Sequence, residues 1–115
     1  METLQDKTAA GFILRLKGRL DASNATGLEQ QIRHTLNSGE TRLLIDLSQL
    51  DYVSSAGLRV FLIAAKLLKS AGGKFALFTL KENVKEVFDL AGFTSIFTIV
   101  PTQEDAMNLL TNGAF

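Results

Sequence analysis

Segments with apolar residues at every second position alternate along the chain with segments where they recur every three or four positions. Phe12, Leu14 and Leu16 follow the two-residue period, which predicts a strand over residues 11–17. Residues 4–8 can form a partner strand, with a turn over residues 8–11. An antiparallel hairpin is therefore expected at the start of the chain.

The first helical pattern follows this hairpin and ends at Gly39. Ser23, Asn24 and Thr26 are candidate N-caps, and Thr26 with Glu29 fits a capping box. The residues that share one face at helical spacing are Ala25, Leu28, Ile32, Thr35 and Leu36.

The rest of the chain alternates strands and helices. Strands are predicted over residues 42–47, 74–80 and 95–100, and helices over 55–70, 81–91 and 102–111. The order ββαβαβαβα implies parallel strands joined by right-handed crossovers. The expected fold is α/β: a mixed sheet of about five strands with an antiparallel edge hairpin, and about four helices mostly on one face. Residues 1–115 are expected to form a single domain.

Composition excludes several kinds of site. Twelve basic residues balance twelve acidic ones, so no global field favours nucleic acid or an anionic membrane. The chain has no cysteine and a single histidine, His34, predicted near a helix end, which argues against thiolate or histidine-rich metal sites. Neither a cofactor nor a metal is expected. The polar start and the absence of a long apolar run predict a cytoplasmic protein.

The helix predicted over residues 55–70 has two contrasting sides at 100° per residue. The side expected to face the sheet carries Gly57, Phe61, Ala64, Ala65 and Leu68. The opposite stripe carries Ser55, Arg59, Leu62, Ile63, Lys66 and Ser70. Leu62 and Ile63, expected to be exposed, are either isolated surface residues or the centre of a docking surface with basic flanks.

Ser54 and Ser55 stand where this helix begins. Either hydroxyl could be the N-cap, which is the usual role of serine at this place. A helix N-terminus also favours a phosphate, and phosphorylation of Ser55 would add about −1.5 to −2 charges one turn before Arg59. The sequence has no GxGxxG, P-loop or GxSxG motif and offers no base beside Ser55, so a binding protein is predicted rather than an enzyme.

Several motifs, in their order and spacing, resemble the STAS domain family, in particular single-domain bacterial anti-sigma factor antagonists. The segments that carry the resemblance are Gly18-Arg19-Leu20-Asp21, Leu44-Ile45-Asp46-Leu47-Ser48, Tyr52-Val53-Ser54-Ser55-Ala56-Gly57-Leu58, Gly72-Gly73 and Val87-Phe88-Asp89-Leu90-Ala91-Gly92-Phe93. The resemblance covers nearly the whole chain.

The resemblance implies a protein that binds an anti-sigma factor when unphosphorylated and so releases a sigma factor. The anti-sigma factor is also a serine kinase of the histidine-kinase-like ATPase fold, which phosphorylates the antagonist and is released. A phosphatase of PP2C type resets the system. The acceptor maps to Ser55. The implied partner-binding residues are Asp21, Ser54, Ser55, Ala56, Gly57, Leu58, Arg59, Leu62, Ile63 and Lys66.

The chain departs from the best-known members of the family on both sides of the acceptor. After the acceptor, Ala56 takes the place of a second hydroxyl residue. Those members carry an aspartate immediately before the acceptor serine, where this chain has Ser54. A second reading therefore stays open: a STAS scaffold or small-ligand-binding module that is not phosphorylated, in which Ser55 is only a helix cap.

Overall fold

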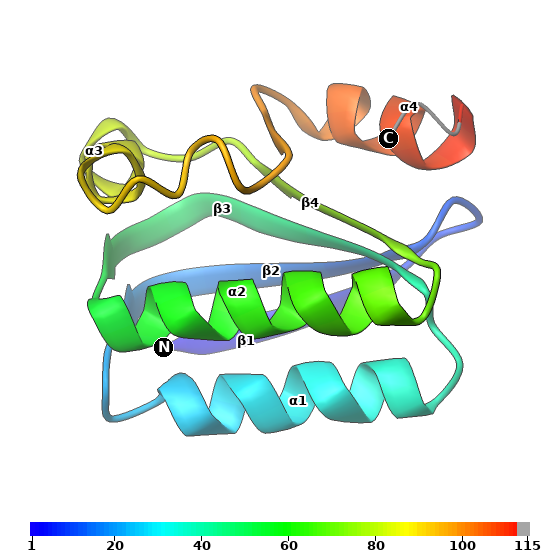
Figure 1. Ribbon diagram of the computed structural model, residues 1–115, viewed down its shortest axis with the longest axis horizontal. Helices are drawn as coiled ribbons and strands as arrows, with labels where there is room; N and C mark the ends of the chain where they lie inside the picture. Colours follow the sequence, from blue (N-terminus) through cyan, green and yellow to red (C-terminus); the bar gives the residue numbers. More distant parts are fainter. Residues whose placement is uncertain (113–115) are drawn as a thin grey trace.

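The computed structural model describes residues 1–112, so the last three residues of the predicted domain, 113–115, lie outside the described part. The predicted order ββαβαβαβα is confirmed (Figure 1). The elements are β1 (Glu2–Lys7), β2 (Phe12–Leu20), α1 (Ala25–Asn37), β3 (Arg42–Val53), α2 (Ser55–Ser70), β4 (Lys74–Phe78), α3 (Glu82–Leu90), β5 (Ile99–Val100) and α4 (Gln103–Asn112).

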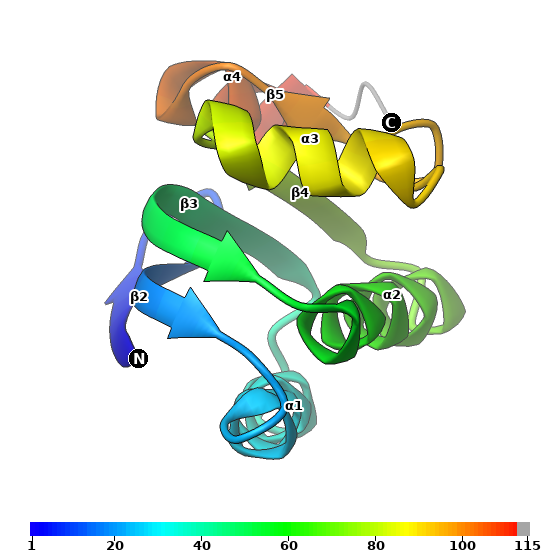
Figure 2. The same ribbon diagram turned by 90° about the vertical axis from the view of Figure 1, so that its left-hand side faces the viewer.

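The strands form one mixed sheet in the order β1-β2-β3-β4-β5. The predicted hairpin is confirmed, because β1 runs antiparallel to β2. All other neighbours are parallel, so β2, β3 and β4 end at the same side of the molecule. Figure 2 faces this side, with the carboxyl ends of β2 and β3 beside the starts of α1 and α2.

The helices cover the two faces of the sheet unequally. The larger hydrophobic core joins α1, α2 and α3 to one face, and includes the stacked rings of Phe61 and Phe88, whose centroids are 6.0 Å apart. The smaller core packs Ala106 and Leu110 of α4 on the other face. The expectation that most helices share one face is therefore confirmed. None of the helices within residues 1–112 combines the length and the apolar character needed to cross a bilayer.

A partly buried ion pair lies where β3 departs from regular pairing. The β2–β3 register shifts between Arg15 and Lys17, and again between Gly18 and Arg19. Asp46, only 8% exposed, accepts hydrogen bonds from Nη1 of Arg15 at 2.8 Å and from the backbone N–H of Ser48 at 2.9 Å. The Asp46 carboxylate thus pairs with a cation and also accepts a backbone hydrogen bond next to the first register shift.

The strand predicted over residues 42–47 is too short, because β3 continues to Val53. Its second half pairs with the second half of β2, as far as Leu20 and Val53. The extension brings β3 to the start of α2. Register shifts of this kind depend on the neighbouring strand, so the periodicity of apolar residues within one segment does not predict them.

The strand predicted over residues 95–100 is wrong in extent, since β5 contains only Ile99 and Val100. Residues 93–97 form a turn in which the backbone N–H groups of Ile96 and Phe97 donate to the carbonyl of Phe93. The ring of Phe97 packs edge-on against those of Phe75, Phe88 and Phe93. Burial of this ring holds the segment in the turn.

The capping box predicted at Thr26 and Glu29 is also wrong. The helix α1 begins at Ala25, and Asn24 occupies the N-cap position without a side-chain capping bond. The Asn24 side chain instead accepts from the N–H of Asp21 and donates to the carbonyl of Arg19. It therefore organises the loop between β2 and α1.

The Arg15–Asp46 pair gives a stability prediction. Replacing Arg15 with alanine leaves a buried carboxylate without its cation, so unfolding should become easier by about 2–3 kcal/mol. Lys17→Ala, on the same strand but at an exposed position, is the matched control and should change stability by less than about 0.5 kcal/mol. Urea denaturation measures both variants, and equal midpoints would contradict the role given to the pair.

Candidate functional site

The candidate site lies where β2 and β3 end and α1 and α2 begin (Figure 2). The backbone N–H of Ser54 donates to the carbonyl of Leu20 at 2.9 Å. Asp21 directly follows Leu20, and Ser55 directly follows Ser54. This bond therefore holds together two predicted site segments that are more than thirty residues apart in the sequence.

The two serines have different roles in the structure. Ser54 is the N-cap of α2: its Oγ accepts from the N–H of Gly57 at 3.3 Å, and its carbonyl accepts from the N–H of Leu58. Ser55 is the first helical residue and is exposed. Its hydroxyl makes no hydrogen bond within residues 1–112. The reading in which Ser55 is only the helix cap is therefore wrong, and Ser55 has the accessible, unengaged hydroxyl.

Gly57 permits the first turn of α2 to lie against the strand ends. A Cβ at this position would come within 2.7 Å of Leu20 Cγ and 2.9 Å of Val53 Cγ2. Real Cβ atoms do not approach other atoms this closely, so a larger residue would displace the helix. Gly57 and Leu58 are buried, and they position the site without forming part of its surface.

The other predicted contact residues differ in exposure. Arg59 and Lys66 are exposed like Ser55, whereas Leu62 and Ile63 are half-buried. The expectation of an exposed Leu62–Ile63 pair is wrong, because the packing of neighbouring elements against α2 is not visible on a single helix. Leu62 packs against the main core. Ser54, Ala56 and Asp21 are also half-buried.

The accessible part of α2 is positively charged. The helix carries Arg59, Lys66 and Lys69, all exposed, and no acidic residue. Arg59 lies one turn after Ser55 and lines a shallow groove of about 180 Å³ between α1 and α2. An anion at Ser55 would thus meet both the free N–H groups of the helix start and a nearby guanidinium.

Asp21 is fixed by the residues that follow it. Its carboxylate accepts from both the hydroxyl and the backbone N–H of Ser23, and these bonds lower the pKa of Asp21, with a smaller contribution from Arg19. A lowered pKa favours the charged form. Its stabilising contribution is present above the pKa of an unfolded-chain aspartate and is lost as the pH falls through the lowered value.

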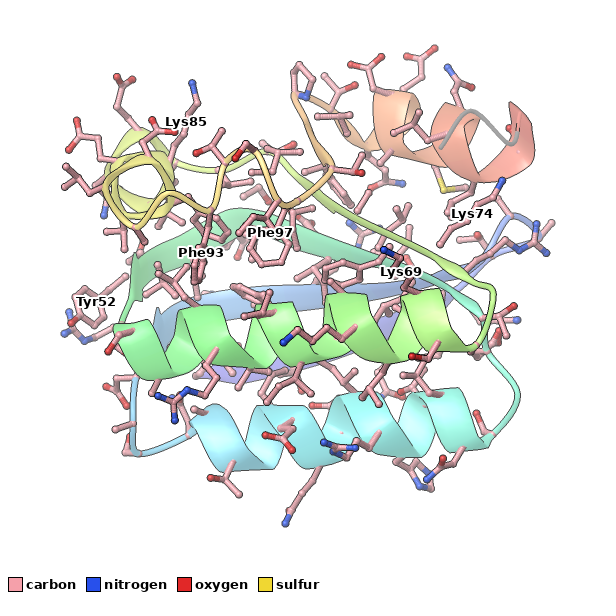
Figure 3. The ribbon with its side chains drawn as sticks, in the orientation of Figure 1. Tyr52, Lys69, Lys74, Lys85, Phe93 and Phe97 are labelled. Atoms are coloured by element: carbon pink, nitrogen blue, oxygen red, sulfur yellow. The ribbon has the colours of Figure 1, made fainter. Side chains whose placement is uncertain are left out.

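The sequence motifs did not identify a second feature at this end of the sheet. The guanidinium of Arg19 lies 4.2 Å from the centre of the Tyr52 ring, a cation–π contact between β2 and β3. Tyr52, labelled in Figure 3, is 38% exposed. Arg19 and Tyr52 are paired in the register that follows the second shift, so their contact depends on tertiary structure.

Within residues 1–112 no group of three or more histidine, aspartate or glutamate side chains is arranged to hold a metal ion. The arrangement consists of an accessible hydroxyl on a helix start with basic residues along the same helix. Such a site can accept a modifying group and contact a protein surface.

Comparison with known proteins agrees with this arrangement. The family model described as the STAS domain matches residues 2–106. BtrV of Bordetella bronchiseptica, provisionally named an anti-sigma factor antagonist, is 42% identical over 106 residues, covering 92% of this chain and 91% of the relative.

Three solved structures show the same fold. A protein of Thermotoga maritima, provisionally described as an anti-sigma factor antagonist, superposes with a TM-score of 0.90 at 26% identity, covering 95% of this chain and 94% of the other. The anti-sigma factor antagonist SpoIIAA in its unphosphorylated form gives 0.83 at 19% identity, covering 96% and 97%. SpoIIAA of Bacillus in its phosphorylated form gives 0.71 at 20% identity, covering 93% and 97%.

The close contact at Gly57 gives a prediction with an internal control. Gly57→Ala should destabilise the protein by about 2 kcal/mol, because the clash with Leu20 and Val53 exceeds the gain in helix propensity. Gly27→Ala in α1, where an added Cβ meets nothing within 4 Å, should stabilise it by about 0.5–1 kcal/mol. Thermal unfolding that moves both variants in the same direction would contradict this account.

Alanine substitutions of Ser54 and Ser55 should have different effects on the stability of the protein. Ser54→Ala removes the capping oxygen of α2 and should cost about 1 kcal/mol. Ser55→Ala removes an exposed hydroxyl and should change stability by less than about 0.5 kcal/mol. Chemical denaturation of the two variants measures the difference; a larger loss for Ser55→Ala would reverse the assignment of the cap.

Proposed function

The chain belongs to the STAS domain family, and we propose that it is an anti-sigma factor antagonist switched by phosphorylation of Ser55. The observation that carries the proposal is the division of labour between the serines: Ser54 caps α2, and Ser55 presents a free hydroxyl at its start. The names of BtrV and the Thermotoga protein support the antagonist function. SpoIIAA, which shares the fold, exists in phosphorylated and unphosphorylated forms.

In its unmodified form the protein binds an anti-sigma factor through the start of α2 and the adjoining Asp21 loop, and so frees a sigma factor. The surface available for this contact includes Ser55, Arg59 and Lys66, with half-buried Leu62 and Ile63 between the two cations. Binding is the whole activity of this chain, which acts on its partner without catalysing a reaction.

The bound anti-sigma factor is also the kinase, of the histidine-kinase-like ATPase fold. Oγ of Ser55 forms a bond to the γ-phosphorus of ATP while the bond to the leaving ADP oxygen breaks. The hydroxyl proton passes to a base of the kinase. A phosphatase of PP2C type later hydrolyses the phosphoserine and restores the binding form.

Phosphate at Ser55 blocks binding without unfolding the chain. The helix start and Arg59 can accommodate the new negative charge, so the helix remains intact. A docked partner, by contrast, would have to bury about two additional charges at the centre of the contact. Release therefore follows from local electrostatics at the interface.

An unphosphorylated scaffold or small-ligand-binding module is the competing function. It is favoured by Ser54, which stands where well-known relatives carry an aspartate. The two functions differ in whether Ser55 ever receives a phosphoryl group.

Phosphorylation and its mimic test the proposal. Incubation with the purified cognate kinase and ATP should add one phosphate, and fragmentation mass spectrometry should locate it on Ser55. Ser55→Asp should weaken binding to the anti-sigma factor by at least about ten-fold, because it adds a negative charge that the docked partner would have to bury. Ser70→Asp, at the opposite end of the same helix, is the matched control and should bind within about two-fold of the unaltered protein.

Two results would oppose this function. Phosphate found on another residue would remove Ser55 from its role. Binding of the kinase without any phosphorylation, together with full binding by Ser55→Asp, would favour the scaffold.

A further inference from the structure

The cation–π pair of Arg19 and Tyr52 lies at the same end of the molecule as Ser55. Tyr52 precedes Ser55 by three residues, so their Cα atoms are at most about 11 Å apart. Figure 3 shows Tyr52 projecting from the end of the molecule at which α2 begins. The pair takes no part in capping α2 or in presenting the hydroxyl of Ser55.

Tyr52 is exposed, but its position is fixed. The residue keeps 38% of its surface exposed, while the guanidinium of Arg19 lies 4.2 Å from the centre of its ring. The chain is anchored on both sides, because the carbonyl of Asp51 accepts a hydrogen bond from Nδ2 of Asn83 and the side chain of Val53 is buried. The ring would therefore lose little conformational freedom when a partner covers it.

Arg19 has the Tyr52 ring as its close side-chain contact. Within residues 1–112 its guanidinium makes no hydrogen bond or ion pair, although its charge contributes to the lowered pKa of Asp21. The backbone carbonyl of Arg19 accepts a hydrogen bond from Nδ2 of Asn24, which fixes the point where the side chain leaves the strand. The structural effect of the side chain is thus to hold the ring.

The ring stands at the rim of the sheet. Arg19 and Tyr52 form the last pair but one between β2 and β3, followed only by Leu20 and Val53. Successive side chains of a strand alternate in direction, so Val53 lies toward α2 and Tyr52 lies on the other face. A protein that docks against these strand ends meets Ser55 on one side of the rim and the Tyr52 ring on the other.

The size of an ordinary protein contact includes both residues. A stable contact buries about 800 Å² on each partner, which corresponds to a patch roughly 30 Å across. Centred on Ser55, such a patch extends about 15 Å in each direction, which is more than the chain allows between Ser55 and Tyr52. A partner that covers Ser55 therefore has the reach to cover the ring as well.

We propose that Tyr52 is an anchor of the contact with the anti-sigma factor and that Arg19 positions its ring. The inference rests on the proposed function, since it adds a part to the surface that the anti-sigma factor covers. Tyrosine is among the residue types that dominate the energy of protein contacts, and a ring held in place binds at a lower entropic cost. The contact thus spans the strand ends as well as α2.

NMR of the unaltered chain tests the anchor directly. Tyr52 is the single tyrosine of the chain, so its ring can be observed alone after incorporation of isotope-labelled tyrosine. Titration with the unlabelled, purified cognate anti-sigma factor should move the ring signal to a new chemical shift as the complex forms. Because no substitution is involved, the result does not depend on the stability of a variant.

Substitutions measured by calorimetric titration give the size of the effect. Tyr52→Ala should weaken binding by at least about ten-fold, and Tyr52→Phe, which keeps the ring, should stay within about three-fold. Arg19→Ala should weaken binding by about three-fold in the unaltered chain but should add no loss to Tyr52→Ala, because it acts through the ring. Ile96→Ala, at an exposed apolar side chain beside Lys69 near the far end of α2, is the matched control and should bind within about two-fold.

The outcomes separate this inference from the function on which it rests. A complex that forms without moving the ring signal, or full binding by Tyr52→Ala, would overturn the anchor and leave the switch at Ser55 in place. Additive losses for the two alanine variants would contradict the positioning role of Arg19. A moved ring signal without phosphorylation of Ser55 would support the anchor and count against the switch, whereas failure of the unaltered chain to bind the anti-sigma factor would reject both.

Discussion

The close contact between the first turn of α2 and the ends of β2 and β3 is the constraint on which the rest of the site depends. Gly57 lets the helix lie on Leu20 and Val53, and the bond from Ser54 N–H to the Leu20 carbonyl locks the two strand ends together. The same geometry uses the Ser54 hydroxyl as the cap. Because Ser54 accepts the capping bond at the start of α2, the hydroxyl of Ser55 is left exposed.

The charge distribution along α2 fits a switch that works without a change of fold. The helix has three cations and no anion, which favours the phosphoryl group that we propose at its start. In the proposed function, stability and regulation are assigned to adjacent residues, since within residues 1–112 Ser54 contributes the capping bond and Ser55 contributes none. Modification of Ser55 can then alter an interface while leaving the structural support of the helix intact.

Irregular pairing occurs at two places in the sheet. Past the register shifts between β2 and β3, β3 continues to the start of α2, and Arg19 lies against Tyr52. Next to the first shift, the carboxylate of Asp46 accepts a hydrogen bond from the backbone N–H of Ser48. At the other end of α2, the burial of Phe97 shortens β5 and leaves Phe75 at an open edge. In each place a side chain that is satisfied in the interior determines where the backbone leaves the regular ladder.

The sequence by itself determined the element order, the bounds of α2 as residues 55–70, the edge hairpin and the family, because local periodicity and motif spacing are properties of a continuous segment. It also placed the candidate acceptor at Ser55. Only the tertiary structure decided that Ser54 caps the helix, that Leu62 and Ile63 are half-buried, and that β5 stops at two residues. These features depend on contacts between segments distant in the chain, such as Leu20 with Ser54 and Phe97 with Phe75, which no local pattern encodes.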